Sequence, residues 1–367
     1  MTKKIRAFGA LVLVTVWAAL AGFTWFTPAK ATSEAERRPL VQFPTVSADT
    51  LLSGKFMEKF EDYTLDQFPG RDAFRRLKSL IHYNVFLQKD NNGIYIVDGS
   101  AAKLEYPVKE QAVSHATDRL NYIYETYLKP AGSKVYMAVV PDKGYYLAEA
   151  NGYPAMDYEA MFSRVQQAMP WATHIDLTDC LSAGDYYRTD THWRQEKLLP
   201  VAQKLAAALG VAGPKLEDFT KKPLERPFYG VYYGQAALPM DPEQLYVLES
   251  ELLQSCRVYN YETQSYTDVY DMKKQSGKDL YEVFLSGPQS ILRIENPHAK
   301  TDRELIVFRD SFGSSVTPLL VQDYKTVTLV DIRYINSRIL DRHLDFQGQD
   351  VLMLYSTLVL NNGTSLQ

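Results

Sequence analysis

Residues 305–314 read LIVFRDSFGS, and this segment is the most informative one about the fold. Its first four residues are all apolar, which is typical of a strand buried on both faces of a parallel sheet. Asp310-Ser311 ends the strand, and a helix is expected to follow over residues 314–323. A strand-to-helix turn at the carboxyl edge of such a sheet exposes the Ser311 hydroxyl where open α/β proteins bind ligands. The alternative is structural, because Asp and Ser are also common helix N-caps.

The segments on either side repeat the alternation of strand and helix. A continuous apolar run predicts a strand at 135–140, and further strands are expected at 174–177, 326–330 and 351–355. Apolar residues spaced by three and four positions predict a helix at 113–127, and further helices are expected at 158–169, 195–209 and 335–343. This order predicts the α/β class, with a parallel sheet flanked by helices. Residues 212–290 interrupt it with aromatic, turn-rich sequence, which predicts an antiparallel β-rich insertion.

The first 31 residues carry a membrane-targeting pattern. Lys3, Lys4 and Arg6 precede the apolar stretch 8–26, which would form a helix of about 28 Å, close to the thickness of a bilayer core. This length favours an uncleaved signal anchor with its basic end in the cytoplasm. The alternative is a signal peptide cleaved near Ala29-Lys30-Ala31. In both cases the remaining chain is expected on the extracytoplasmic face of the membrane, or secreted after cleavage.

The rest of the chain divides into two predicted parts. Residues 32–90 form a linker with Pro39 and Pro44, followed by amphipathic helices at 51–65 and 74–85. Residues 91–367 form the α/β domain with its insertion, and 93–97 are expected to begin a hairpin.

Composition excludes several classes of function. The 367 residues include 40 Lys and Arg against 44 Asp and Glu, a net charge of −4 that gives no electrostatic basis for binding nucleic acid. Two cysteines exclude a disulfide scaffold, and pairing of Cys180 with Cys256 is left open. The chain has no HExxH or paired-His motif, so neither a metal nor a cofactor is expected.

A second segment supplies what a nucleophilic serine requires. Residues 186–193 read YYRTDTHW and place Asp190 two positions before His192. In an extended loop these two side chains point the same way. A serine needs a base to attack at neutral pH, and the base needs an orienting carboxylate. Among the six histidines, only His192 lies beside a carboxylate in a loop after a predicted strand.

These two segments resemble the DHHW protein family and the related alginate O-acetylation proteins of the SGNH/GDSL hydrolase-like superfamily. The resemblance is carried by Asp190-x-His192-Trp193 and Asp310-Ser311-Phe312, and by Glu36-x-Arg38-Pro39-Leu40, Asp66-Gln67-Phe68-Pro69-x-Arg71-Asp72, Val140-Pro141-Asp142-Lys143 and Val330-Asp331-Ile332-Arg333-Tyr334. In this branch the Asp and His precede the Ser, a permuted order. Thr191 stands where the family name has a second His, which matches the alginate branch better.

The resemblance implies an SGNH-hydrolase-like fold with Ser311 as nucleophile, His192 as base and Asp190 as its orienting carboxylate. It also implies that the Ser311 backbone N–H forms part of the oxyanion hole. Five further residues are candidates for binding substrate or the oxyanion, each with a structural alternative: Lys143, Trp193, Arg309, Arg333 and Asn336. For Trp193 the alternatives are stacking on a sugar ring or packing in the core.

The implied function is an extracytoplasmic O-acetyltransferase that passes an acetyl group from Ser311 to an envelope or secreted polysaccharide. A membrane-bound O-acyltransferase is the implied partner, and the N-terminal helix contacts the membrane. One alternative is a carbohydrate acetylesterase with the same triad, in which water is the acceptor. A further alternative is a glycan-binding or envelope assembly protein that keeps the fold without catalysis.

Overall fold

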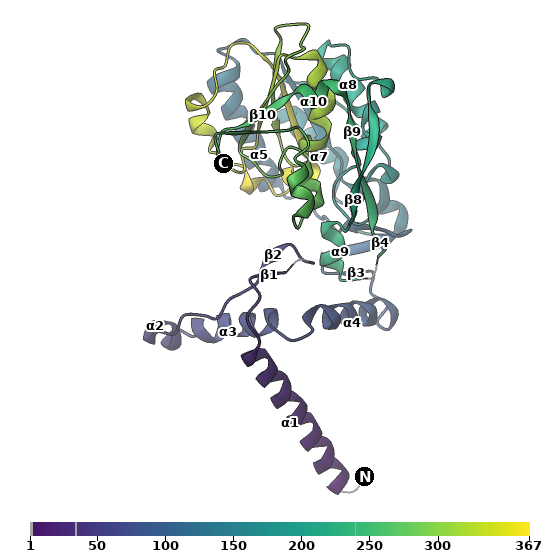
Figure 1. The fold of residues 1–367 in the computed structure, drawn as a ribbon, viewed down its shortest axis with the longest axis vertical. Helices are drawn as coiled ribbons and strands as arrows, with labels where there is room; N and C mark the ends of the chain where they lie inside the picture. Colours follow the sequence, from purple (N-terminus) through teal and green to yellow (C-terminus); the bar gives the residue numbers. More distant parts are fainter. Residues whose placement is uncertain (1–2, 34, 239) are drawn as a thin grey trace. The chain divides into compact units, whose positions relative to one another are not determined.

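The computed structural model describes residues 3–33, 35–238 and 240–367. The chain forms two compact units, Met1–Asn92 with Tyr233–Pro239, and Gly93–Tyr232 with Met240–Gln367. The labels are those of Figure 1.

The larger unit is built on an eight-stranded sheet with the order β11-β10-β12-β14-β13-β15-β6-β7. Its strands are β6 (Val135–Val140), β7 (Thr173–Ile175), β10 (Arg257–Asn260), β11 (Ser265–Thr267), β12 (Ile291–Glu295), β13 (Glu304–Arg309), β14 (Thr326–Val330) and β15 (Asp350–Ser356). The five strands from β14 to β7 are parallel, and β12, β10 and β11 continue the sheet in antiparallel pairs. The mixed α/β class, with a mostly parallel sheet, is therefore confirmed.

Helices cover both faces of this sheet, as Figure 1 shows. The helices of the larger unit are α5 (Glu110–Ile123), α6 (Lys143–Leu147), α7 (Tyr158–Ala168), α8 (Leu199–Leu209), α10 (Glu251–Ser255), α11 (Gly313–Val316) and α12 (Thr357–Leu360). Helix α9 (Val231–Ala236) begins in the larger unit and ends in the smaller one. In β13, Val307 faces the cluster that includes α8, whereas Ile306 and Phe308 face the cluster that includes α5 and α7. The uniform apolar run of 305–308 follows from this burial on both faces.

The insertion splits between two sheets. β8 (Thr220–Phe228) and β9 (Glu243–Glu249) form a separate antiparallel pair. β10 and β11 instead join the main sheet through β12. A hairpin of β4 (Ile94–Val97) and β5 (Ser100–Lys103) forms at the expected place, and β3 (Asp90–Asn91) precedes it.

Several helices differ from the sequence prediction. The expected helix at 335–343 is a shorter 3₁₀ segment, Ser337–Arg342, and 314–323 is α11 followed by the 3₁₀ segment Thr317–Asp323. The helix expected at 195–209 starts as α8 only at Leu199, and the end of the one at 113–127 is a π-helical turn, Tyr124–Leu128. The spacing of apolar residues indicates which side of a segment is buried. A 3₁₀ or π-helical segment can bury that side as an α-helix does.

The smaller unit contains the N-terminal helices. They are α1 (Lys3–Phe26), α2 (Ala48–Leu52), α3 (Lys55–Asp66) and α4 (Arg71–Asn84), with the short strands β1 (Thr32–Ser33) and β2 (Arg38–Pro39). The helix expected at 51–65 is broken into α2 and α3 because Gly54 adopts a φ of +77°, which ends one helix and starts the next.

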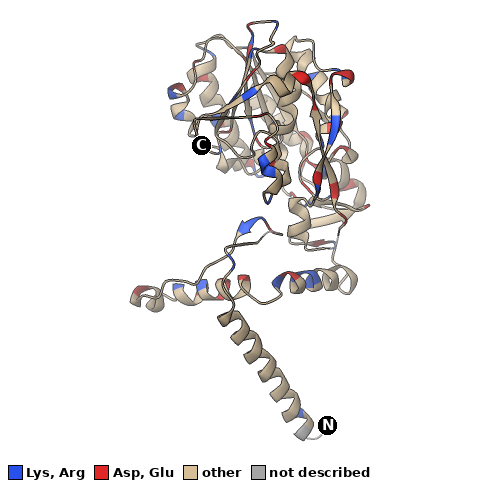
Figure 2. Cartoon of the chain, viewed as in Figure 1, with Lys and Arg blue, Asp and Glu red and all other residues tan. Residues whose placement is uncertain are grey.

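Among the described residues, α1 is the one helix long and apolar enough to cross a membrane, over Ile5–Phe26. Figure 2 shows that charges are almost absent from α1 and gather on α3 and α4. Cys180 and Cys256 are both free thiols, so no disulfide joins them.

Candidate active site

Three side chains from the two segments meet at the carboxyl edge of the parallel strands. Ser311 directly follows β13, and its Oγ lies 2.7 Å from Nε2 of His192. Nδ1 of His192 lies 2.6 Å from Oδ1 of Asp190. Ser311 is partly exposed, whereas His192 is 8% exposed and Asp190 is fully buried. The serine hydroxyl can therefore meet a substrate while the base and carboxylate stay sheltered from water.

The Asp190 carboxylate is held from two sides. Oδ1 accepts the backbone N–H of His192 at 3.0 Å, and Oδ2 accepts the backbone N–H of Val231 at 2.7 Å. The segment that begins α9 approaches so closely that a Cβ on Gly230 would overlap Asp190 and the Thr189 carbonyl. Only glycine fits at position 230 without a steric overlap, and this close approach places the Val231 amide within hydrogen-bond distance of Asp190.

Glu243, in β9, holds the loop that carries Asp190 and His192. Its carboxylate accepts the backbone N–H groups of Arg188 and Thr189 at 2.8 and 2.7 Å. It also accepts the Thr189 hydroxyl at 2.9 Å and a guanidinium N–H of Arg194 at 2.6 Å. Hydrogen bonds to a buried carboxylate are among the stronger ones in proteins. One side chain from the insertion therefore fixes both ends of the loop.

Lys143 also holds this loop, through hydrogen bonds to its backbone carbonyls. Its ammonium group donates to the carbonyls of Ala101, Tyr187 and Arg188, and the side chain is 2% exposed. Burial lowers the pKa of Lys143, and nearby carboxylates raise it. Burial has the larger effect, so the pKa is lowered to about 7. The structure therefore places Lys143 as a buried loop support with no surface open to a substrate.

Aromatic rings fix the plane of the His192 imidazole. Tyr281 stacks on it with a centroid distance of 3.9 Å and an interplanar angle of 10°. The Tyr281 hydroxyl is within 2.8 Å of the Ser315 hydroxyl, which ties the ring to α11. The Phe312 ring packs against the imidazole in a tilted arrangement, with a centroid distance of 5.1 Å. The base is thus held by packing as well as by its bond to Asp190.

The turn that carries Ser311 is shaped by Asp310. One of its carboxylate oxygens accepts the N–H of Phe312 at 3.0 Å, and the other accepts the N–H of Ser356 at 2.7 Å. Asp310 thereby joins the ends of β13 and β15. Within the described part of the chain, the Ser311 backbone N–H has no hydrogen-bond acceptor. It is available to an oxyanion formed at Ser311.

Two further predicted site residues, Trp193 and Arg309, are buried. Trp193 is fully buried, stacks edge-on against Phe312 and donates to the Ser315 hydroxyl at 2.9 Å. Its ring has no face open to a sugar, so the structure supports the packing alternative. Arg309 is 1% exposed and lies 3.7 Å from Asp331.

Arg333 and Asn336 follow β14. Arg333 forms a two-pronged ion pair with Asp331, at 2.9 and 2.6 Å. Asn336 is exposed and caps the next 3₁₀ segment by accepting the N–H of Arg338. Neither residue contacts the Ser311 turn through these bonds. Their substrate-binding roles stay predictions, and their observed partners are a carboxylate and a helix end.

Sequence reasoning missed Gly230, Glu243 and Tyr281. All three belong to the insertion, whose aromatic sequence predicted only antiparallel structure. A glycine among bulky aromatics in FYGVYY is the one signal that pointed to a close approach. Among the described residues, no group of three or more His, Cys, Asp or Glu could hold a metal ion.

Comparison with known proteins identifies a family resemblance and a shared fold. The family model described as DHHW protein matches residues 160–330, a segment that contains Asp190, His192 and Ser311. The resemblance seen in the sequence is therefore confirmed over that segment. No curated protein matches the chain.

Two solved structures share the fold at low sequence identity. A DHHW family protein from Eubacterium siraeum has a TM-score of 0.62 and 22% identity, and the match covers 75% of this chain and 94% of that one. Bacillus cereus PatB1, solved with a sulfonyl adduct, has a TM-score of 0.57 and 17% identity, with 73% and 95% covered. The O-acetyltransferase domain of Pseudomonas putida AlgJ is more distant, with a TM-score of 0.46, 15% identity, and 73% and 92% covered.

Proposed function

We propose that the protein is a serine-dependent O-acetyltransferase that modifies a polysaccharide outside the cytoplasm through an acetyl-Ser311 intermediate. The observation that carries the proposal is the continuous hydrogen-bonded row from Asp190 through His192 to Ser311, with distances of 2.6 and 2.7 Å. This is the geometry of a nucleophile, its base and the orienting group of that base.

The reaction would proceed in two acyl transfers. His192 takes the proton of Ser311 as Oγ attacks the acetyl carbonyl of the donor, and the Ser311 N–H stabilises the oxyanion. His192 then protonates the leaving group, which departs and leaves an acetyl ester on Ser311. In the second half, His192 removes a proton from a sugar hydroxyl, which attacks the ester. The oxygen of Ser311 leaves and regains its proton from His192.

The setting is supported by two further observations. The apolar helix α1 suits an anchor or signal that places the catalytic unit beyond the membrane. The resemblance to the alginate O-acetylation proteins favours a polysaccharide acceptor and a membrane-bound O-acyltransferase as the source of acetyl groups. PatB1, which shares the fold, was captured with a sulfonyl adduct, and a sulfonyl fluoride is therefore a suitable probe of Ser311.

The test uses the full chain in detergent with a chromogenic acetyl ester and, separately, with a sulfonyl fluoride. We expect mass spectrometry to find the acetyl or sulfonyl group on the Ser311 peptide. Turnover should be lost in Ser311→Ala and His192→Ala. Ser314→Ala removes a hydroxyl one turn away and is the matched control, which should keep activity.

Adding oligosaccharides then separates the alternatives. Acetylated sugar as product supports transfer. Acetate alone, at a rate that no oligosaccharide changes, would assign an acetylesterase. Equal behaviour of all four proteins, with no adduct, would refute catalysis and favour a glycan-binding role.

A further inference from the structure

The smaller unit has many more exposed large hydrophobic side chains than the larger unit. Of the large hydrophobic residues that are exposed among those described, all but five lie between Ile5 and Leu87. The five exceptions are Tyr106, Leu216, Tyr229, Tyr266 and Tyr334, and four of these carry a hydroxyl. Contiguous exposed apolar surface marks an interaction site.

Helix α4 is oriented opposite to an ordinary surface helix. Its polar side chains face the segment 233–239 of the same unit: Arg75 donates to the Gly234 carbonyl, Arg76 to the Tyr233 hydroxyl and Ser79 to the Ala236 carbonyl, each at 2.8 Å. Ser79 is fully buried. An ordinary surface helix would turn its apolar stripe toward the protein instead.

The apolar stripe of α4 faces outward. Phe74 and Leu77 are 53% and 52% exposed, and Val85, just after the helix, is 66% exposed. Leu77 lies two residues from Ser79, about 200° around the helix, so the exposed and buried sides are opposite one another. The exposed stripe continues into Phe86 and Leu87, which are 63% and 78% exposed. Lys78, beside the stripe, is also exposed.

This stripe starts close to the end of the apolar helix α1. The indole of Trp25 lies 6.3 Å from the Phe60 ring of α3. The backbone of Lys30 exchanges two hydrogen bonds with the Gln67 side chain, at 2.9 and 3.0 Å. Gln67 stands four residues before α4 begins.

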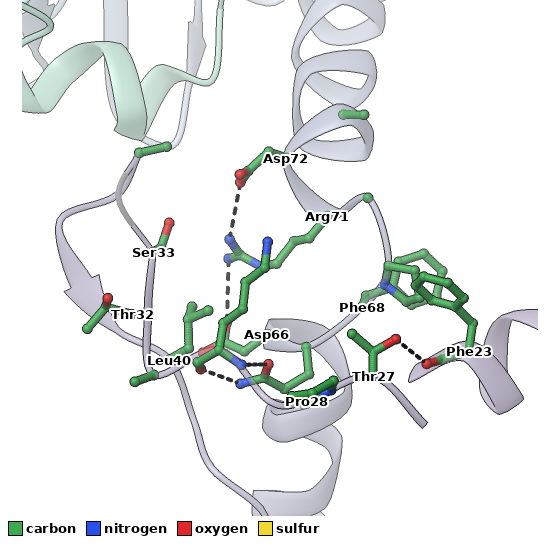
Figure 3. A pocket seen from close by; sticks show the side chains of 17 residues that line it. Phe23, Thr27, Pro28, Thr32, Ser33, Leu40, Asp66, Phe68, Arg71 and Asp72 are labelled. Carbon is green, nitrogen blue, oxygen red and sulfur yellow. Dashed lines mark hydrogen bonds and ion pairs between the residues drawn. The ribbon is translucent and has the colours of Figure 1, made fainter. Parts of the chain in front are cut away.

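A cavity of about 760 Å³ lies at this junction. Figure 3 shows Phe23 of α1 lining it together with Phe68 and Arg71, the first residue of α4. The end of a helix suited to cross the bilayer and the start of the exposed stripe therefore share one cavity wall.

We propose that α4 lies on the outer surface of the lipid bilayer, with Phe74, Leu77 and the apolar residues at 85–87 inserted among the lipids. The stripe has the character of an interfacial helix, apolar on one side and basic on the other. Its closeness to the end of α1 puts it at the level of the headgroups, where Trp25 also belongs. Lys78 can extend its charge to anionic headgroups while its stem stays apolar. The inference does not depend on acyl transfer.

The test places a fluorophore on either side of α4 in the full chain. Cys180→Ser removes the partly exposed native thiol, and Cys256 is buried. Leu77→Cys carries an NBD label on the outward stripe. Asp72→Cys carries it about 140° away on the same helix, at a position whose side chain is 57% exposed. Each protein is reconstituted into vesicles of phosphatidylcholine and phosphatidylglycerol.

At position 77 we expect blue-shifted emission and quenching by lipids that carry a nitroxide in the upper acyl chain. At position 72 we expect the emission of an aqueous label and no quenching. A label at Trp17→Cys, within α1, should be quenched in every sample and shows that the chain is inserted. Aqueous emission at position 77 in such vesicles would overturn the proposal. Protection of position 77 in native membranes but not in lipid vesicles would also overturn it and assign the stripe to a protein partner.

Discussion

Gly230→Ala tests whether the insertion positions the Asp190 carboxylate, which we propose orients His192. The added methyl group would overlap the Asp190 Cβ and the backbone carbonyl of Thr189. A backbone carbonyl cannot move aside as a flexible side chain can, so the loop and the α9 segment must separate by about 1 Å. A misplacement of this size in a catalytic group can cost about 10²-fold in rate, which corresponds to about 2.7 kcal/mol in the activation barrier. The Val231 hydrogen bond to Asp190 would lengthen at the same time.

The assay is steady-state turnover of an acetyl ester, with far-ultraviolet circular dichroism and thermal unfolding of the same samples. We expect kcat to fall about 10²-fold while the circular dichroism spectrum stays native. Gly184→Ala is the matched control, because a Cβ there would lie 3.7 Å from its nearest neighbour, an ordinary contact. A folded Gly230→Ala protein whose kcat is within twofold of the parent would refute the argument that this close approach positions Asp190.

Three further predictions concern the residues that support the site. Glu243→Gln should lower the free energy of unfolding by about 1–3 kcal/mol and lower kcat with little change in KM, because it weakens the bonds that hold the loop; chemical denaturation and steady-state kinetics check this. Because burial lowers the pKa of Lys143 from its ordinary 10.5 to about 7, the unfolded chain binds one more proton between these values. Relative to Lys143→Met, the free energy of unfolding should therefore rise by about 1.4 kcal/mol per pH unit above about pH 7; a falling or flat difference would show that the lysine stays charged. Trp193→Phe should destabilise the fold by about 1–3 kcal/mol and leave the affinity for an oligosaccharide unchanged in titration calorimetry, whereas a loss of affinity alone would restore the stacking role.

The main sheet could be predicted because the local residue pattern of its strands indicates strand structure. Residues 305–308 are all apolar, and residues 326–330 combine apolar residues with the β-branched Thr326 and Thr328. Both compositions favour a strand covered on both faces. The helix boundaries were less predictable. The spacing of apolar residues in 335–343 reports which side is buried, and a 3₁₀ segment at 337–342 buries the same residues as an α-helix would.

In the insertion, the local residue pattern predicts the strands but not their partners. Its alternating aromatics predicted antiparallel strands, and β8, β9, β10 and β11 are antiparallel. Nothing in the sequence indicates that β10 joins the main sheet or that Glu243 accepts four hydrogen bonds from the loop at 188–194. Those partners lie about 50 residues away along the chain, and their pairing depends on the packing of the whole unit.

The sequence identifies the residues that are chemically able to act: a serine at a strand end, and an aspartate and a histidine two positions apart. It also determined the apolar length of α1, since hydropathy is a local property. The folded chain is needed to show that Oγ of Ser311 and Nε2 of His192, 119 positions apart, lie 2.7 Å from each other. It also decided that Trp193, Lys143 and Arg309 are buried supports. The physical reason is that burial and hydrogen-bond partnership are set by the three-dimensional environment of a residue, and the same side chain can bind a sugar at a surface or fill a core.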